Sequence, residues 1–405
     1  MEFKHKKLAN GLNIVAEVNK DAQSAAIGFF VKTGSRDETD KINGVSHFLE
    51  HMLFKGTDKL STHDVNRTFD DLGAHYNAQT SEENTIYYAA LLPEQLAEVT
   101  KLWCQLMRPA LRDDDFNMEK NVILEEIAMY KDLPQFDVMD SCRTLHFGEH
   151  PCAKSVLGTV ESIKALTSGQ MREYFESRYA PNNITAAVAG NFDFEKICDC
   201  IENLCGGWKP KKAERITEYF AGTAKKEHHK RKNLKCQHIC LMSPTVSYQD
   251  ERAYAATLLA KIIGDDTGSR FFWELVDSAI AETAGMHCEA MDGVGAFFSY
   301  IRAESKNSPK AMQIIEKIFK SLQEKISTAE LQKAKNKVLS GITIKNEIPM
   351  GRLVELGVNW VYLGRYRPIE DEIQQIKKVT LADIQNLIEQ FPLTNFTQFS
   401  IGPEK

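Results

Sequence analysis

The pentapeptide His47-Phe48-Leu49-Glu50-His51 places two imidazoles and a carboxylate at a spacing that suits metal-assisted hydrolysis. On a helix of 3.6 residues per turn, His47 and His51 lie one turn apart on one face, so both can bind a single metal ion. Glu50 lies beside that face, within reach of a water on the metal. Zinc with an open coordination position activates water, and a neighbouring carboxylate can move its proton. The pattern predicts amide hydrolysis, with a chance match on an amphipathic helix as the alternative.

A third ligand must come from another segment. Residues 113–127 begin with three acidic residues that favour a helix start and continue with a helical pattern. In this segment Glu119 and Glu126 fall two turns apart on one stripe. One of them would complete a His₂Glu site, and the other would support it. A solvated acidic face is the alternative interpretation of this pair.

The elements that must position these residues are readable from the same sequence. Gly44-Val45-Ser46 offers a helix start and Gly56 a helix end around the pentapeptide. Elsewhere, apolar runs with strand character alternate with longer helical patterns, at Ala25–Lys32, Ile86–Leu92, Asn183–Gly190, Phe297–Ala303 and Phe396–Ile401. This alternation predicts an α/β or α+β class. The fold we expect is α+β, with a mostly antiparallel sheet and packed helices in each domain.

The chain also contains an internal repeat. The segment 163–167 recurs at 376–380, and each copy precedes an amphipathic helix and an apolar strand. Two tandem copies of one α/β unit follow. Superposing the copies places Leu259, Ile262 and Ile263 opposite His47, Glu50 and His51, and Gly341 near the counterpart of Glu126. The second copy is therefore predicted to lack a metal site.

Length and polar segments predict the domain boundaries. A chain of 405 residues fits two domains of similar size. The predicted division is a catalytic zinc-binding domain at 1–210, a linker at 211–232 and a homologous non-catalytic domain at 233–405. The basic run 225–232 is interpreted as part of a solvated linker rather than a nucleic-acid site.

Composition narrows the class of protein and its location. A net charge of −6 disfavours a nucleic-acid partner. The first residues lack the apolar core of a signal peptide, and no stretch suits a membrane span, so we expect no membrane partner and a cytoplasmic location. The 9 Cys form no obvious framework, which predicts free and mostly buried thiols in a reducing compartment.

Several motifs together resemble one peptidase family. Besides the H-x-x-E-H pentapeptide, 74 residues separate His51 from Glu126, and Glu119 lies seven residues before Glu126. The run 73–88 looks like an edge strand and its successor, and segments between 150 and 191 follow in the expected order. By these features the chain resembles the inverzincin zinc peptidases that include pitrilysin, insulysin and the mitochondrial processing peptidase, as a short bacterial-type member. The resemblance is specific over residues 1–210 and weaker beyond.

The resemblance implies roles for the residues that match the family motifs. His47, His51 and Glu126 would hold one Zn²⁺ per chain, with Mn²⁺ and Co²⁺ as alternatives for this ligand set. Glu50 would be the general base and Glu119 a supporting catalytic carboxylate.

The resemblance also implies a substrate and an assembly. Asn77 and Ala78 would lie on the strand that pairs with extended peptide substrates. The two domains would form a clam-like enclosure, in a homodimer or alternatively in a heterodimer.

The sequence departs from the family pattern in one segment, and this departure leaves two possible functions. Relatives carry an Arg and a Tyr in the second half that bind the substrate carbonyl, but the corresponding segment here, 274–283, contains neither. Loss of such donors slows acyl transfer. A zinc endopeptidase that cuts short unfolded peptides or presequence-like segments is the first interpretation. A catalytically impaired scaffold or partner-dependent subunit of the same fold is the alternative.

Overall fold

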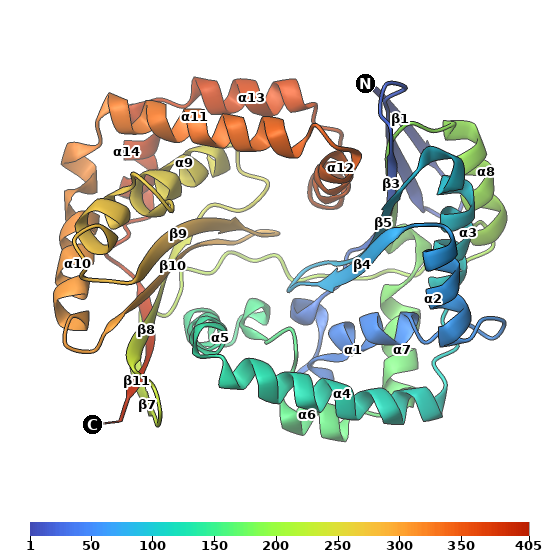
Figure 1. The fold of residues 1–405 in the computed structure, drawn as a ribbon, viewed down its shortest axis with the longest axis horizontal. Helices are drawn as coiled ribbons and strands as arrows, with labels where there is room; N and C mark the ends of the chain where they lie inside the picture. Colours follow the sequence, from blue (N-terminus) through green and yellow to red (C-terminus); the bar gives the residue numbers. More distant parts are fainter. Residues whose placement is uncertain (405) are drawn as a thin grey trace. The chain divides into compact units, whose positions relative to one another are not determined.

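The computed structural model describes residues 1–404, which form two compact units. The first unit comprises 1–127, 154–216 and 342–367. The second unit comprises 128–153, 217–341 and the residues from 368 on. Each unit contains one sheet with helices packed against it (Figure 1). The predicted fold class of two α+β domains is confirmed, while the clam-like enclosure stays a prediction.

The first sheet has six strands in the order β1-β2-β6-β3-β5-β4. The bounds are β1 Glu2–Lys7, β2 Asn13–Val18, β3 Ala25–Val31, β4 His75–Thr80, β5 Thr85–Leu91 and β6 Ile184–Gly190. Only β2 and β6 pair in parallel. The central strands β3 and β6 are buried along their whole length, which explains their continuous apolar sequences. Strand β4 ends the sheet, and its outer edge is free of any strand described.

Helices cover both faces of the first sheet. The larger core joins one face to helices that include α1 Val45–Leu53, α3 Leu96–Leu106, α7 Ser168–Arg178 and α8 Phe194–Cys205. Helices α2 Thr62–Asp71 and α6 Val160–Ala165 also contribute to this core, together with the N-terminal part of α4 Asp113–Asp132. The other face, which includes Val15, Ala26 and Phe30, packs against α12 Pro349–Leu363.

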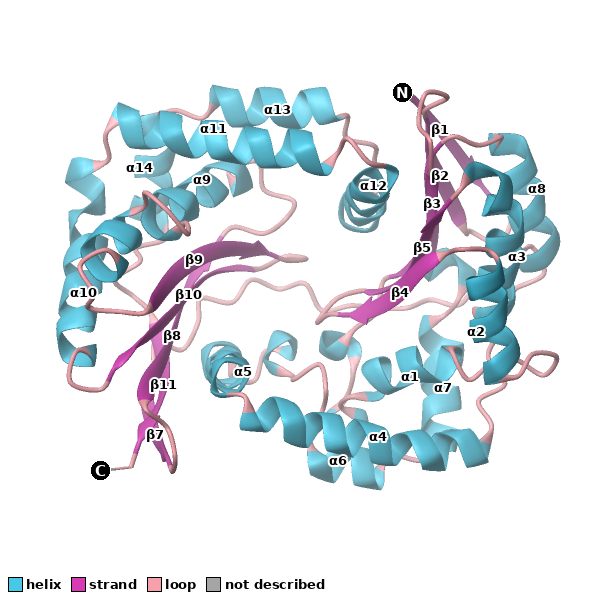
Figure 2. Cartoon of the chain, in the orientation of Figure 1, coloured by secondary structure: helices cyan, strands magenta, loops and turns pink. Residues whose placement is uncertain are grey.

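The second sheet has five strands in the order β7-β11-β8-β10-β9 (Figure 2). The bounds are β7 Lys226–Arg231, β8 Cys236–Thr245, β9 Thr283–Ala290, β10 Gly295–Glu304 and β11 Thr397–Pro403. Helix α5 Pro134–Phe147 packs against β8 and β11, and α9 Ala253–Gly264 packs against β9. The remaining long helices are α10 Ser308–Lys325, α11 Thr328–Lys345, α13 Ile369–Lys378 and α14 Leu381–Gln390.

Two helices pack against the sheet of the other sequence half. Helix α12 comes from the second half but belongs to the first unit, and α5 comes from the first half but belongs to the second unit. Arg352 on α12 donates from Nε to Oε2 of Glu17 on β2 over 2.6 Å, and both side chains are buried. Gly357 permits the close approach, because a Cβ there would lie 2.3 Å from the Phe30 ring.

The internal repeat appears in matching helix caps. Thr167 caps α7 through a hydrogen bond from the Gln170 backbone N–H, and Thr380 caps α14 through one from Asp383. These threonines end the two repeated pentapeptides. Residues 226–231, within the segment predicted as a linker, form strand β7 in parallel with β11.

The nine cysteines are free thiols, and six of them are buried, as the sequence predicted. Across residues 1–404, the helices are too short or too polar to traverse a lipid bilayer.

Candidate metal centre

Helix α1 presents the H-x-x-E-H residues because its other side is fixed in the core. Phe48, Leu49, Met52 and Leu53 are buried. Phe48 stacks on Phe116 of α4, with ring centroids 4.7 Å apart and planes 9° from parallel. This contact joins the helix of the two histidines to the helix that carries Glu119 and Glu126.

The start of α1 is fixed by Glu38, a residue that the sequence analysis did not identify. Its carboxylate accepts hydrogen bonds from the backbone N–H groups of Gly44, over 2.6 Å, and of Ser46, over 2.7 Å. Burial raises the pKa of Glu38 to about 7, against the opposing effect of these hydrogen bonds. Gly44 has φ 93°, and a Cβ there would lie 2.6 Å from the Leu157 carbonyl oxygen. Both features determine where α1 begins.

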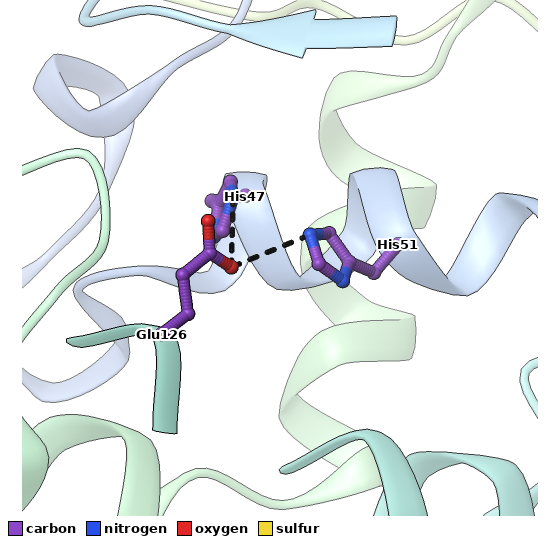
Figure 3. Close-up of side chains that lie close together, drawn as sticks. All are labelled: His47, His51 and Glu126. Carbon is purple, nitrogen blue, oxygen red and sulfur yellow. Dashed lines mark ion pairs between the residues drawn. The ribbon is translucent and has the colours of Figure 1, made fainter. Parts of the chain in front are cut away.

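His47, His51 and Glu126 converge on one point (Figure 3). Oε2 of Glu126 lies 3.8 Å from Nε2 of His47 and 3.7 Å from Nε2 of His51. All three donor atoms lie within 4.8 Å of one another. Tetrahedral zinc with bonds of roughly 2.1 Å needs its donors about 3.4 Å apart, so the two Glu126–histidine distances are already close to the required spacing. Among residues 1–404 this is the group of three such side chains close enough for one ion.

The electrostatics of the three residues suit a cation. Burial and, to a smaller extent, the neighbouring His51 lower the pKa of His47 to about 3, so its imidazole is neutral and can donate a lone pair. Burial raises the pKa of Glu126, although His51 opposes this shift. A cation at the centre would compensate the burial of its carboxylate.

Glu119 supports the site from behind His51. Its Oε1 lies 2.8 Å from Nδ1 of His51, and its Oε2 lies 2.5 Å from Nζ of Lys55. Burial opposes ionisation of Glu119, but the hydrogen bonds from His51 and Lys55 lower its pKa overall. A carboxylate on Nδ1 holds the imidazole with Nε2 directed to the metal position. The role of Lys55 could not be predicted from the sequence, because it depends on the packing of α4 against the end of α1.

Glu50 projects from α1 beside the three donors. Burial raises the pKa of Glu50, while a hydrogen bond from Thr80 opposes the shift. The Thr80 hydroxyl donates to Oε2 of Glu50 over 2.5 Å. Thr80 also was not identified from the sequence. Asn77 and Ala78 lie on β4, and the structure places that strand at the edge of the sheet and against α1.

The second half carries no equivalent centre among the described residues. Leu259, Ile262 and Ile263 are buried apolar residues of α9, and Gly341 lies on α11. The segment 274–283, where the Arg and Tyr are missing, starts in a π-helical turn and includes Ala279 with φ 54°.

Exchanging Glu119 for Gln is expected to weaken Zn²⁺ affinity by about 10- to 100-fold. A neutral Gln supports the tautomer of His51 less well, and it cannot balance the positive charge of Lys55. Competition with a chromophoric chelator measures this affinity. Glu125→Gln is the matched control, since Glu125 is exposed on the same helix. Equal zinc affinity in the two variants would contradict a supporting role for Glu119.

Two family models match the chain in succession. The model described as "Insulinase (Peptidase family M16)" matches residues 13–160, and the one described as "Peptidase M16 inactive domain" matches residues 165–338. The second description agrees with the absence of metal ligands from α9.

Similar proteins span almost the whole chain. An uncharacterized zinc protease of Mycobacterium leprae is 30% identical over 404 residues, which cover 98% of this chain and 91% of that protein. An uncharacterized zinc protease of Bacillus subtilis is 29% identical, with 97% of each chain covered. A protease structure from Helicobacter pylori shares the fold with a TM-score of 0.92 at 20% identity, covering 99% of this chain and all of that one.

Proposed function

Because this chain belongs to the M16 (insulinase) peptidase family, we propose that it is a zinc-dependent endopeptidase that cuts short unfolded peptides or presequence-like segments. The observation that carries the proposal is the convergence of His47, His51 and Glu126 with Glu50 beside them. Two imidazole nitrogens that face one carboxylate oxygen form a donor set for a metal ion, which a solvated acidic face would not need.

The residues of the site have different roles in the proposed hydrolysis. His47, His51 and Glu126 would hold Zn²⁺, which supplies Lewis acidity for the water and the scissile carbonyl. Glu50 accepts the proton that the water loses as its oxygen attacks the carbonyl carbon. Glu50 then delivers this proton to the amide nitrogen as the C–N bond breaks. The Glu119 carboxylate keeps His51 oriented throughout.

Strand β4 supplies the binding mode for substrate. Its outer edge pairs with no strand among residues 1–404, and Asn77 and Ala78 lie on this strand. The Ala78 N–H donates to Oδ1 of Asn77 over 2.9 Å. A peptide that adds as a further strand is held through its main chain, so the substrate must be extended and its sequence is loosely specified. We propose extended peptides as the partners of this edge.

The assembly and location of the enzyme are part of the proposal. We propose a cytoplasmic homodimer. A heterodimer is the alternative, because a partner subunit would supply the Arg and Tyr missing from 274–283. The same absence favours a second candidate function, that of a catalytically impaired scaffold or partner-dependent subunit.

A library of quenched fluorescent, unstructured peptides tests the proposed function. The purified protein is expected to carry about one zinc per chain and to cleave the library, to lose cleavage after chelation and to regain it with added Zn²⁺. Zinc binding without cleavage would contradict the peptidase and favour the scaffold. Cleavage that appears only with a second subunit would identify the heterodimer.

A further inference from the structure

Thr80 connects the general base to the edge strand. It is the last residue of β4 and shares a strand face with Ala78, two residues earlier. Strand β4 contacts α1, the helix that carries Glu50. The Thr80 hydroxyl donates to Oε2 of Glu50 over 2.5 Å, and within residues 1–404 the Glu50 carboxylate accepts no other hydrogen bond. The hydroxyl therefore holds one carboxylate oxygen, and Oε1 is left to receive a proton.

The turn that follows Thr80 is held rigidly. The Ser81 backbone N–H donates to the Asn84 carbonyl over 2.9 Å, and the Ser81 hydroxyl oxygen accepts from the Asn84 N–H over 3.0 Å. The Arg36 backbone N–H donates to the Glu82 carbonyl over 2.9 Å. Gly34 allows this contact, because a Cβ there would lie 2.2 Å from the Ser81 carbonyl oxygen. Thr80 is thereby fixed in position by its chain neighbours.

Helix α12 also contacts this turn. The Tyr362 hydroxyl donates to Oε2 of Glu83 over 2.5 Å and accepts from Nδ2 of Asn84 over 2.9 Å. Glu83 also forms a buried ion pair with Arg36. A turn fixed by a buried ion pair and a helix has little freedom to carry Thr80 away from Glu50.

We propose that Thr80 is a positioning residue that fixes the orientation of the Glu50 carboxylate and ties it to the strand that receives the peptide. The proposal rests on the proposed peptidase function. A general base must present one oxygen within hydrogen-bond reach of the water, and a carboxylate free to rotate meets this requirement for part of the time only. A hydroxyl on a rigid strand end removes that freedom.

Thr80→Val keeps the branched shape and removes the hydroxyl, and Thr80→Ser keeps the hydroxyl. We expect kcat to fall about tenfold in Thr80→Val, with KM for a quenched peptide and Zn²⁺ affinity within about twofold of wild type. Thr80→Ser is expected to recover most of kcat. Thr257→Val is the matched control, because Thr257 is exposed on α9 and its hydroxyl bonds within that helix.

Three results would overturn the proposal. A raised KM with unchanged kcat would make Thr80 a residue of the substrate strand alone. A Thr80→Ser rate as low as that of Thr80→Val would show that the hydroxyl is not needed. Lowered Zn²⁺ affinity in Thr80→Val would mean that Thr80 acts through the metal ligands.

A measurement without activity separates this proposal from the peptidase proposal. Unfolding midpoints of Thr80→Val, Glu50→Ala and the double variant form a double-mutant cycle. The hydrogen bond predicts that the double variant shifts by less than the sum of the single shifts. If wild type cuts no peptide, the peptidase proposal fails, and additive midpoints in this cycle would independently contradict the link between Thr80 and Glu50.

Discussion

Glu50→Gln is expected to lower kcat/KM by about 10³-fold while the protein keeps its zinc. A positioned general base contributes on the order of 10² to 10⁴ in rate, and Gln cannot accept the proton. Gln is nearly the same size as Glu, and its amide oxygen can still accept from Thr80, so the geometry of His47, His51 and Glu126 should persist. Initial rates on a quenched peptide, with metal content measured on the same samples, test this expectation.

The control for Glu50→Gln is Glu125→Gln, an exposed carboxamide exchange next to Glu126 that should leave the rate unchanged. If the Glu50→Gln variant binds zinc and its kcat/KM lies within about tenfold of the wild-type value, Glu50 is excluded as the general base. A variant that loses zinc would instead show that Glu50 contributes to metal binding, and the rate would then say nothing about proton transfer.

Arg352→Leu is expected to be the most destabilising of the proposed variants. Arg352 and Glu17 are 4% and 1% exposed, and the Tyr366 hydroxyl also donates to Glu17 over 2.7 Å. Removing the guanidinium leaves a buried carboxylate without its counter-charge, which costs roughly 3–5 kcal/mol. Urea unfolding followed by tryptophan fluorescence suits this region, since Trp360 on α12 lies against Phe3 and His5.

Glu17→Gln/Arg352→Leu is the informative second variant. It removes both charges, so it should unfold at a higher urea concentration than Arg352→Leu alone. A loss below about 1 kcal/mol in Arg352→Leu would indicate that water reaches Glu17 and that the pair does not anchor α12.

Local periodicity accounts for the parts of the fold that the sequence predicts well. The helix of His47 and His51, the helix of Glu119 and Glu126 and the buried strands all depend on spacing within a few residues. Strand β7 was not predicted, because its sequence, KEHHKR, has no apolar alternation. As an exposed edge strand it has almost no side chain to bury, and lysines suit such an edge.

Residues whose roles depend on contacts with distant segments could not be predicted from the sequence. Each of three such residues acquires a role only when another element lies beside it: Glu38 beside the start of α1, Lys55 beside α4 and Thr80 beside Glu50 of α1. No pattern shows which sheet a helix will cover, so the placement of α5 and α12 against the other half's strands could not be predicted either.

The exchange of α5 and α12 makes each unit depend on residues from both halves of the sequence. Helix α12 meets residues encoded more than 300 positions earlier, with Arg352 against Glu17 and Gly357 against Phe30. The effect of a substitution on β2 or β3 on stability therefore depends on how well the new side chain packs against α12. The repeat that lacks the three metal-binding side chains therefore still contributes a helix to the unit that contains them.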